Sequence, residues 1–331
     1  MFASSPGGAW VDLFEPRYTL MGNIGENEIK TGLNLQLASS SNKTLSPTRE
    51  NPSGFLNWLR KSDAGEFGIS TGYSQMATRD AGIDATGQVP ATSIRTSRTL
   101  SGKWDKELSE YNTLSADSTY ESVSYQGGGP FLDYSSQSAG LKFSRALNEK
   151  LKAFFDVSDT EFVLTGVSQS SHSVDAILGM NWKGEYVDST LQGGQSRTGG
   201  GVSYPTGLAT IHYTGSRSQL NLNVSRLVLP SGFGGFVRTD QLGSNWNYAL
   251  SEYSNVGIDL TRINNTLLNN TLVFENITSS ATNTGVWIDR NLTPSWKIRT
   301  YFLRRVLQGS SVGSAFSNMI GLSLTYDNSN L

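Results

Sequence analysis

The sequence predicts an all-β protein, a transmembrane antiparallel up-and-down β-barrel of about 16–18 strands. Three observations predict it: apolar and polar residues alternate with a period of two, short and long connections follow each other in turn, and tryptophans lie beside the short connections. No stretch keeps a helical period, and none approaches the roughly 18 apolar residues of a membrane-spanning helix. We expect one domain over residues 1–331, with an N-terminal segment or short first strand in 1–12, barrel strands in 13–327 and a tail in 328–331.

The composition is low in both apolar and charged residues. Hydrophobic residues make up 37% of the chain and charged residues 16%, whereas soluble domains have roughly 45–50% and 25%. A tenth of the residues are aromatic, which distinguishes the chain from a disordered one. There is no cysteine, which excludes disulfides, thiolate metal sites and cysteine nucleophiles. A water-soluble β protein and an outer-membrane barrel both have this composition, because barrel strands turn only alternate residues toward lipid.

The expected strands are the segments in which every second residue is apolar. The first clear one places Ile29, Leu33 and Leu37 on one face and Lys30 and Asn34 on the other. Period two over about ten residues is typical of a strand with one apolar face. The same alternation recurs in the segments 67–74, 174–183, 209–214, 220–225, 255–260 and 320–326.

The connections between these strands are of two kinds, which alternate along the chain. Short polar turns lie near 24–27, 62–65, 107–110, 147–150, 183–185, 214–218, 250–253 and 292–295, and longer segments near 39–53, 78–92, 126–133, 165–171, 198–206, 229–237, 264–281 and 307–315. This order predicts the short periplasmic turns and long extracellular loops of an outer-membrane barrel. Eight short turns imply sixteen strands, and the last segment adds a seventeenth. Because bacterial barrels have even strand numbers, we expect sixteen or eighteen.

Aromatic residues gather near the short turns. Tryptophan and tyrosine settle at the boundary between membrane and water, where they form girdles at the barrel rims. The alternative is that they fill the core of a soluble protein, but such a core would not place them beside the turns of one end. The predicted girdle consists of Trp58, Trp104, Trp182, Tyr186, Trp246, Tyr248 and Trp296.

Neither a catalytic nor a metal site is predicted. The two histidines, His172 and His212, lie about 40 residues apart in a chain without cysteine, which is not a metal-ligand spacing. Ser170-Ser171-His172 near Asp175 is a local cluster without the geometry of a nucleophilic site. We therefore expect no enzyme, no cofactor, no metal and no nucleic-acid partner.

Inward-facing residues are the ones expected to bear on transport. Their charges are of mixed sign, so we expect no general filter for cations or anions. The segment 290–305 contains no carboxylate and carries five cations, Arg290, Lys297, Arg299, Arg304 and Arg305. They form either a basic stripe for an anionic solute or residues that pair with acids on neighbouring strands or extend to the rim. Alternation places twelve charged residues in or near the lumen: Lys103, Asp117, Glu121, Lys142, Lys152, Asp156, Asp175, Asp240, Asp259, Lys297, Arg299 and Arg305. The predicted lumen and selectivity residues are six of these together with one histidine: Lys142, Asp175, Asp259, Lys297, Arg299, Arg305 and His212.

Four hairpin turns repeat one pattern, a leucine followed by Ser, Asn or Thr and then by Glu or Pro. They are Leu108-Ser109-Glu110, Leu147-Asn148-Glu149, Leu250-Ser251-Glu252 and Leu292-Thr293-Pro294, in the hairpins Trp104 to Leu114, Phe143 to Phe155, Trp246 to Ile258 and Arg290 to Phe302, before a closing strand Ile320–Tyr326. This layout, over most of residues 66–327, resembles the outer-membrane β-barrel porins encoded with exosortase or exopolysaccharide gene clusters. One departure is the end of the chain, Asp327 to Leu331, which lacks a terminal aromatic residue.

The resemblance implies an outer-membrane location in a Gram-negative bacterium and contact with outer-membrane lipid. It implies a lumen that passes a polar solute, an exported polysaccharide or oligosaccharide, without chemistry. The polysaccharide or a periplasmic export component would be the partner. The alternative is a non-conducting barrel that serves as scaffold or sleeve for a protein partner in a cell-envelope complex.

Overall fold

The computed structural model describes residues 7–43, 47–63, 65–77, 93–127, 131–166, 170–232, 234–268, 278–309 and 313–327. The expected loop 78–92 and the expected tail 328–331 lie outside these residues, as do parts of several other expected loops. All regular structure in the described ranges is β. No helix long and apolar enough to cross a membrane occurs in this part of the chain.

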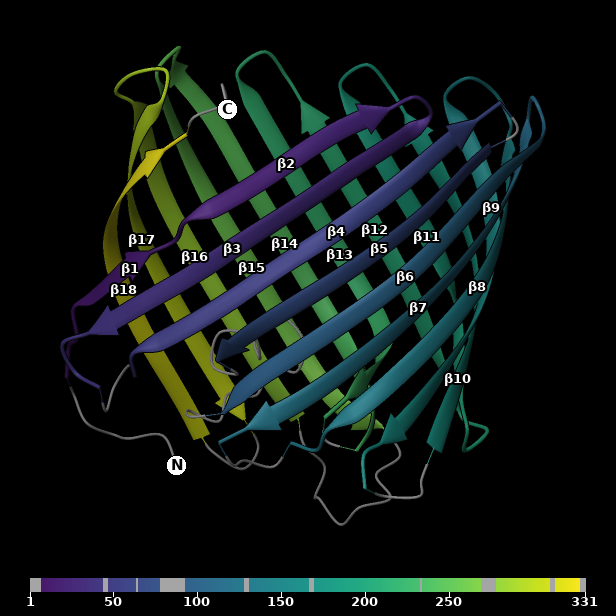
Figure 1. Cartoon of the computed structure of the whole chain (residues 1–331), viewed down its shortest axis with the longest axis horizontal. Helices are drawn as coiled ribbons and strands as arrows, with labels where there is room; N and C mark the ends of the chain where they lie inside the picture. The colour runs from purple at the N-terminus through teal and green to yellow at the C-terminus, as the bar shows by residue number, and fades with distance from the viewer. Residues whose placement is uncertain are drawn as a thin grey trace.

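From β2 onward, successive strands are antiparallel neighbours in a single sheet (Figure 1), so the predicted all-β, up-and-down architecture of about 16–18 strands is confirmed. The strands are β1 Val11–Phe14, β2 Arg17–Ile24, β3 Asn27–Ser40, β4 Arg49–Ser62, β5 Gly65–Ala77, β6 Ile94–Ser109, β7 Asn112–Gln126, β8 Tyr134–Ala146, β9 Leu151–Leu164, β10 Ser170–Lys183, β11 Val187–Thr198, β12 Ser203–Thr214, β13 Ser218–Ser231, β14 Gly235–Ser251, β15 Ser254–Leu268, β16 Thr278–Asn291, β17 Trp296–Gly309 and β18 Gly313–Tyr326.

The first two strands share one position in the sheet. β1 pairs with the end of β3 at Leu37–Ser40, and β2 pairs with the same edge of β3 at Asn27–Asn34. Between them, the Leu35 N–H donates to the Pro16 carbonyl (3.1 Å). Proline has no N–H to donate to the neighbouring strand, which accounts for the break between β1 and β2 along the edge of β3. Eighteen strands thus fill seventeen positions, the odd number obtained by counting turns.

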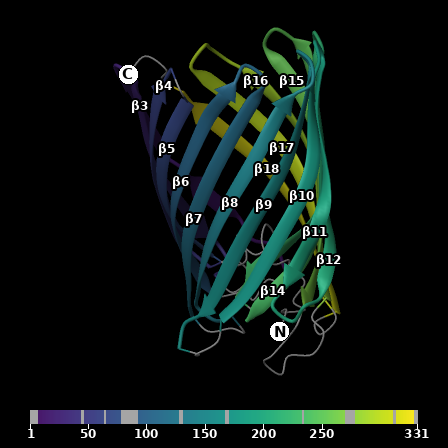
Figure 2. The same cartoon turned by 90° about the vertical axis from the view of Figure 1, so that its right-hand side faces the viewer.

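The sheet curves round into a barrel wall with the short turns at one end and the longer connections at the other (Figure 2). Its two edges are β18 and the row formed by β1 and β2. Among the described residues no strand register joins these edges, so the sheet is not closed. Because the number of positions is odd, both edge strands run from the end with the longer connections to the end with the short turns.

Three of the expected long loops are wrong, because strands occupy most of their residues. In 198–206, β11 runs to Thr198 and β12 begins at Ser203, and in 307–315, β17 runs to Gly309 and β18 begins at Gly313. Residues 229–237 form most of the tip of a hairpin, in which β13 continues to Ser231 and β14 begins at Gly235 opposite it. Gly234 has a φ of 91°, a left-handed conformation that glycine adopts without a steric penalty. The glycines of this segment therefore make a tight turn.

Cross-strand pairing determines which residues share a face of the sheet, because direct partners project to the same side. One row across β3, β4 and β5 is Ile29, Trp58 and Ile69, and another across β8, β9 and β10 is Lys142, Asp156 and Ile177. The first row belongs to the apolar face, whose large side chains are exposed in the isolated chain, and the second to the polar face. The polar face is the concave one, since side chains on it meet across the inside of the wall, as described below.

The assignment of faces can be tested by spin labelling, because a chain without cysteine accepts a single label at an introduced one. Leu178 and Ile177 are neighbours on β10 and project to the outer and inner face, respectively. In reconstituted bilayers we expect the label of Leu178→Cys to be more accessible to oxygen than to a water-soluble nickel chelate, and the reverse for Ile177→Cys. Power saturation in electron paramagnetic resonance measures both accessibilities. Equal ratios at the two positions would contradict the assignment.

Candidate functional site: the inner face of the barrel wall

The strand registers place all seven predicted lumen residues on the inner face: Lys142, Asp175, His212, Asp259, Lys297, Arg299 and Arg305. The prediction for Asp240 is wrong. Asp240 pairs with Arg226 and continues the outer row of Leu242 and Trp246, because β14 runs without a register shift from Gly235 to Ala249. The two histidines lie on opposite faces, since His172 is on the outer face, with its Nε2 3.7 Å from Glu161 Oε1.

A hydrogen-bonded network crosses the inner face from β12 to β17. It begins on β12, where Thr214 Oγ1 lies 3.0 Å from His212 Nε2 and His212 Nδ1 bonds to Asn221 Oδ1. Asn221 Nδ2 donates to Asn245 Oδ1 (3.3 Å), and Asn245 Nδ2 donates to Asp259 Oδ1 (2.5 Å). From His212 on, consecutive members lie on adjacent strands, so these polar groups form a continuous row along the wall.

Trp287 continues this row on β16. Its indole N–H donates to Asp259 Oδ2 (2.8 Å), and the guanidinium of Arg299 lies 4.1 Å from the ring centroid. The ring lies over its cross-strand partner Gly257, where an added Cβ would come within 2.2 Å of the indole. Only glycine leaves room for this ring at the pairing position. Trp287 is not among the lumen residues predicted from the sequence, although it alternates in step with the inward residues of β16.

The network ends in a buried carboxylate, Asp289, which is also not among the lumen residues predicted from the sequence. Asp289 is 1% exposed and accepts hydrogen bonds from Arg299 Nη2 (2.8 Å) and Asn255 Nδ2 (3.1 Å), with Lys297 Nζ at 2.8 Å. A carboxylate held by two cations and an amide is fully satisfied, which a buried charge requires. The two cations are neutralised in part by this acid and stay about 40% exposed on the inner face.

The expected basic stripe is therefore not formed. Lys297 and Arg299 pair with an acid on the neighbouring strand, the alternative left open by the sequence. Arg290 and Arg304 project to the outer face, as the register between β16 and β17 requires. Arg305 remains on the inner face, where its Nε donates to Asn283 Oδ1 (3.3 Å).

The other predicted lumen residues lie elsewhere on the inner wall and are not brought into the network. Lys142 Nζ lies 3.8 Å from the centroid of the Phe154 ring, a cation–π contact between β8 and β9. Asp175 lies opposite Ser196 on β11. The inner wall thus has a connected polar region on β12–β17 and separate charged residues on β8–β11.

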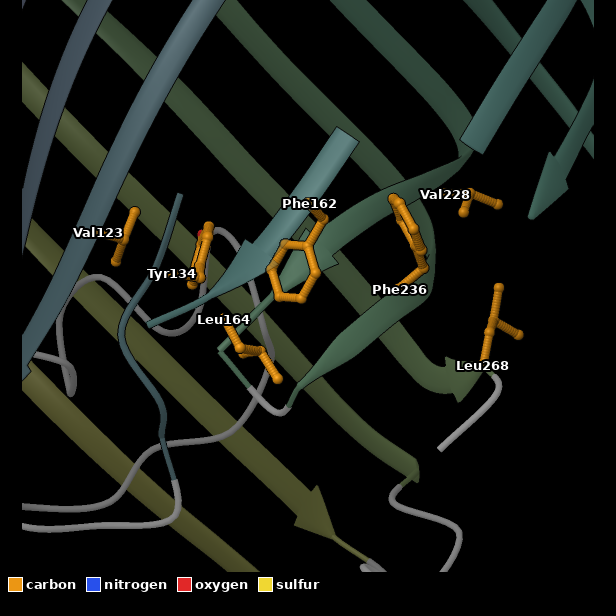
Figure 3. Packing of buried hydrophobic residues seen from close by; sticks show 7 residues of the cluster. All are labelled: Val123, Tyr134, Phe162, Leu164, Val228, Phe236 and Leu268. Carbon is orange, nitrogen blue, oxygen red and sulfur yellow. The ribbon is translucent and has the colours of Figure 1, made fainter. Parts of the chain in front are cut away.

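An apolar cluster crosses the inside at the end with the longer connections (Figure 3). The Phe162 and Phe236 ring centroids are 6.0 Å apart, although three strands lie between β9 and the hairpin of β13 and β14. Consecutive residues Phe236 and Val237 are both buried, so both faces of the hairpin tip are covered. The Leu132 N–H donates to the Gly232 carbonyl (2.7 Å), which fastens the tip to the segment before β8. The cluster consists of Val123, Tyr134, Phe162 and Leu164 from β7–β9 and of Val228, Phe236 and Leu268 from β13–β15.

The predicted girdle residues lie at the end of the wall with the short turns. Cross-strand pairing puts the six that belong to strands on the outer face, and Tyr186, which precedes β11, is 56% exposed. The Trp296 and Tyr326 ring centroids, on the last two strands, are 4.9 Å apart. The role of the predicted girdle residues at a membrane boundary stays a prediction. The six are Trp58, Trp104, Trp182, Trp246, Tyr248 and Trp296.

No family model and no curated protein matches the chain. Among solved structures, it is similar to the FrpB iron transporter from Neisseria meningitidis, with a TM-score of 0.51, 10% identity, and 91% of this chain and 61% of that chain covered. It is also similar to a mutant of the ferric enterobactin receptor PfeA from Pseudomonas aeruginosa, with a TM-score of 0.53, 10% identity, and 97% and 72% covered. The siderophore receptor PirA from the same organism gives a TM-score of 0.51 at 7% identity, with 96% and 70% covered.

The chain has the fold of an outer-membrane β-barrel. It spans 61% of the FrpB chain, less than two thirds of that protein's length. The comparisons agree with the predicted barrel class and support the predicted outer-membrane location. They do not support the exopolysaccharide-associated type in particular.

Removing the carboxylate of Asp289 tests the end of the network. In Asp289→Asn, Lys297 and Arg299 lose the acid that compensates them, and we expect a loss of about 1–3 kcal/mol, below the full cost of breaking a buried pair because both cations are partly solvated. Urea unfolding in detergent micelles, followed by tryptophan fluorescence, measures the change. Asp188→Asn, an exposed inner-face acid on β11, is the control and should lie within about 0.5 kcal/mol of the wild type. Equal losses in the two variants would contradict the proposed importance of the pairing.

Proposed function

We propose that this protein is an outer-membrane barrel that passes a polar solute along its inner face without chemistry. The observation that carries the proposal is the polar network of β12–β17, in which amide, hydroxyl, imidazole, carboxylate and guanidinium groups follow one another across six strands. Such groups exchange hydrogen bonds with solute hydroxyls, while fixed charges bias selectivity. The exposed cations Lys297 and Arg299 would add attraction for acidic groups on the solute.

The solute in this proposal is an exported polysaccharide or oligosaccharide. The resemblance of the repeated hairpin turns to exopolysaccharide-associated barrels supports it, as does the density of hydroxyl-compatible groups on the inner wall. The names of the structural neighbours, an iron transporter and siderophore receptors, agree with passage of a large polar solute and do not favour a carbohydrate.

The apolar cluster obstructs part of the inner face along which the solute would pass. The tip of the β13–β14 hairpin occupies space inside the wall, and its aromatic contacts offer no hydrogen bonds to a polar solute. We expect the wild-type protein to conduct weakly until the tip moves. The same observation favours the second candidate, a non-conducting scaffold or sleeve for a protein partner, which a stoichiometric second chain in affinity purification would support.

Weakening the apolar cluster tests whether ions can pass through the inside of the barrel wall. Phe236→Ala removes the ring that faces Phe162, and we expect a several-fold rise in single-channel conductance in planar bilayers. The substitution costs about 3–5 kcal/mol of stability, so folding is checked by heat-dependent mobility on gels. Phe143→Ala on the outer face of β8 is the control and should leave conductance unchanged. Absence of conductance in both the wild type and a folded Phe236→Ala would count against passage and favour the scaffold.

Two adjacent arginines of β17 test the lumen charges. Arg305 is on the inner face and Arg304 on the outer face. Reversing the inner charge in Arg305→Glu should shift the reversal potential in a salt gradient toward cation selectivity, because fixed charges along a pore set its ion preference. Arg304→Glu should leave the reversal potential unchanged. Equal shifts would show that the inner wall does not line the conducting path.

A further inference from the structure

A groove of about 640 Å³ lies on the outer face, near the end with the longer connections. It lies where two strands separate: the register between β12 and β13 ends at Gly207 opposite Arg226, although β13 continues to Ser231. The strands part there because the hairpin tip of β13 and β14 turns inward to join the apolar cluster. Unpaired backbone in the wall of a membrane barrel is costly, so this separation needs a compensating partner.

The part of the groove nearer the middle of the wall is apolar. Its outward side chains come from four strands and are Leu191, Ala209, Val224 and Leu242. Leu191 and Val224 are more than half exposed in the isolated chain. This surface fits a hydrocarbon chain.

The part nearer the longer connections is cationic. Arg226 makes a two-pronged contact with Asp240, from Nε to Oδ1 at 2.5 Å and from Nη2 to Oδ2 at 3.3 Å, and Arg238 Nε lies 3.6 Å from the same carboxylate. Arg262 also lines the groove and makes no ion pair within the described part of the chain. Three guanidinium groups and one carboxylate leave a local charge of +2.

We propose that this groove binds a membrane lipid that carries a phosphate monoester. Arg226 and Arg262 would contact the phosphate, and an acyl chain would lie along Val224 and Leu242. A monoester carries a charge of about −1.5 to −2 near neutral pH, which matches the local charge better than the single charge of a phosphodiester. The proposal rests on the outer-membrane location proposed above and not on solute passage.

The test is native mass spectrometry of the full chain in detergent with diphosphorylated lipid A, with dephosphorylated lipid A and with phosphatidylglycerol. We expect retention of the diphosphorylated lipid, and at least a tenfold loss of affinity in Arg226→Gln/Arg262→Gln, since charge-assisted hydrogen bonds contribute about 1.5–3 kcal/mol each. Arg290→Gln/Arg304→Gln removes two outward arginines of β16 and β17 and should bind as the wild type. Equal loss in this control, or equal binding of all three lipids, would overturn the proposal.

Two further arms separate the remaining outcomes. Leu242→Trp fills the apolar part without removing charge and should also weaken binding of the diphosphorylated lipid; unchanged binding would refute the acyl contact. If inorganic phosphate alone binds as tightly as the lipid by calorimetry, the site is an anion site and the proposal fails. Conductance of Arg226→Gln/Arg262→Gln should equal that of the wild type, so failure of lipid binding is distinguishable from failure of the passage proposal.

Discussion

Backbone hydrogen bonding is the constraint on which the rest of this structure depends. In hydrocarbon every N–H and C=O needs a partner, so a membrane-spanning sheet must pair each strand on both sides. From β3 to β17 each strand does so, over registers of up to fifteen pairs. A slip of one residue in any of them would exchange the inner and outer faces. The edges formed by β18 and by β1 with β2 are the places where this requirement is not met among the described residues.

Continuous pairing is also what assembles the inner network. Asn245, Asp259 and Trp287 are far apart in the chain, and they meet because two successive registers bring them to neighbouring positions. The large rings on this face need space above the opposite backbone. Gly257 under Trp287 and Gly321 under Tyr301 provide it, since an added Cβ at either would lie 2.2 Å from the ring. The pairing of aromatic residues with glycine thus follows from the register and in turn helps to specify it.

Period-two alternation was enough to predict the strands, the positions of the short turns and the inner face for residues such as Lys297 and Asp259. It could not predict which charges meet, because the pairing of Asp289 with Lys297 and Arg299 depends on the offset between β16 and β17, which the sequence does not state. It also misjudged residues 229–237, where glycine and proline suggested a loop. There the deciding interaction is tertiary: Phe236 packs against Phe162 of a distant strand.

The inward turn of the β13–β14 hairpin links the inner and outer surfaces. Arg226 and Val228 are two residues apart on β13, yet the first lines the outer groove and the second belongs to the inner cluster. The same displacement that brings Val228 and Phe236 inside ends the pairing with β12 and opens the groove. If a lipid occupies that groove, its binding energy favours the arrangement with the tip inside, because a ligand stabilises the conformation that it binds. By reciprocity, a solute that displaces the tip must weaken lipid binding by the same free energy.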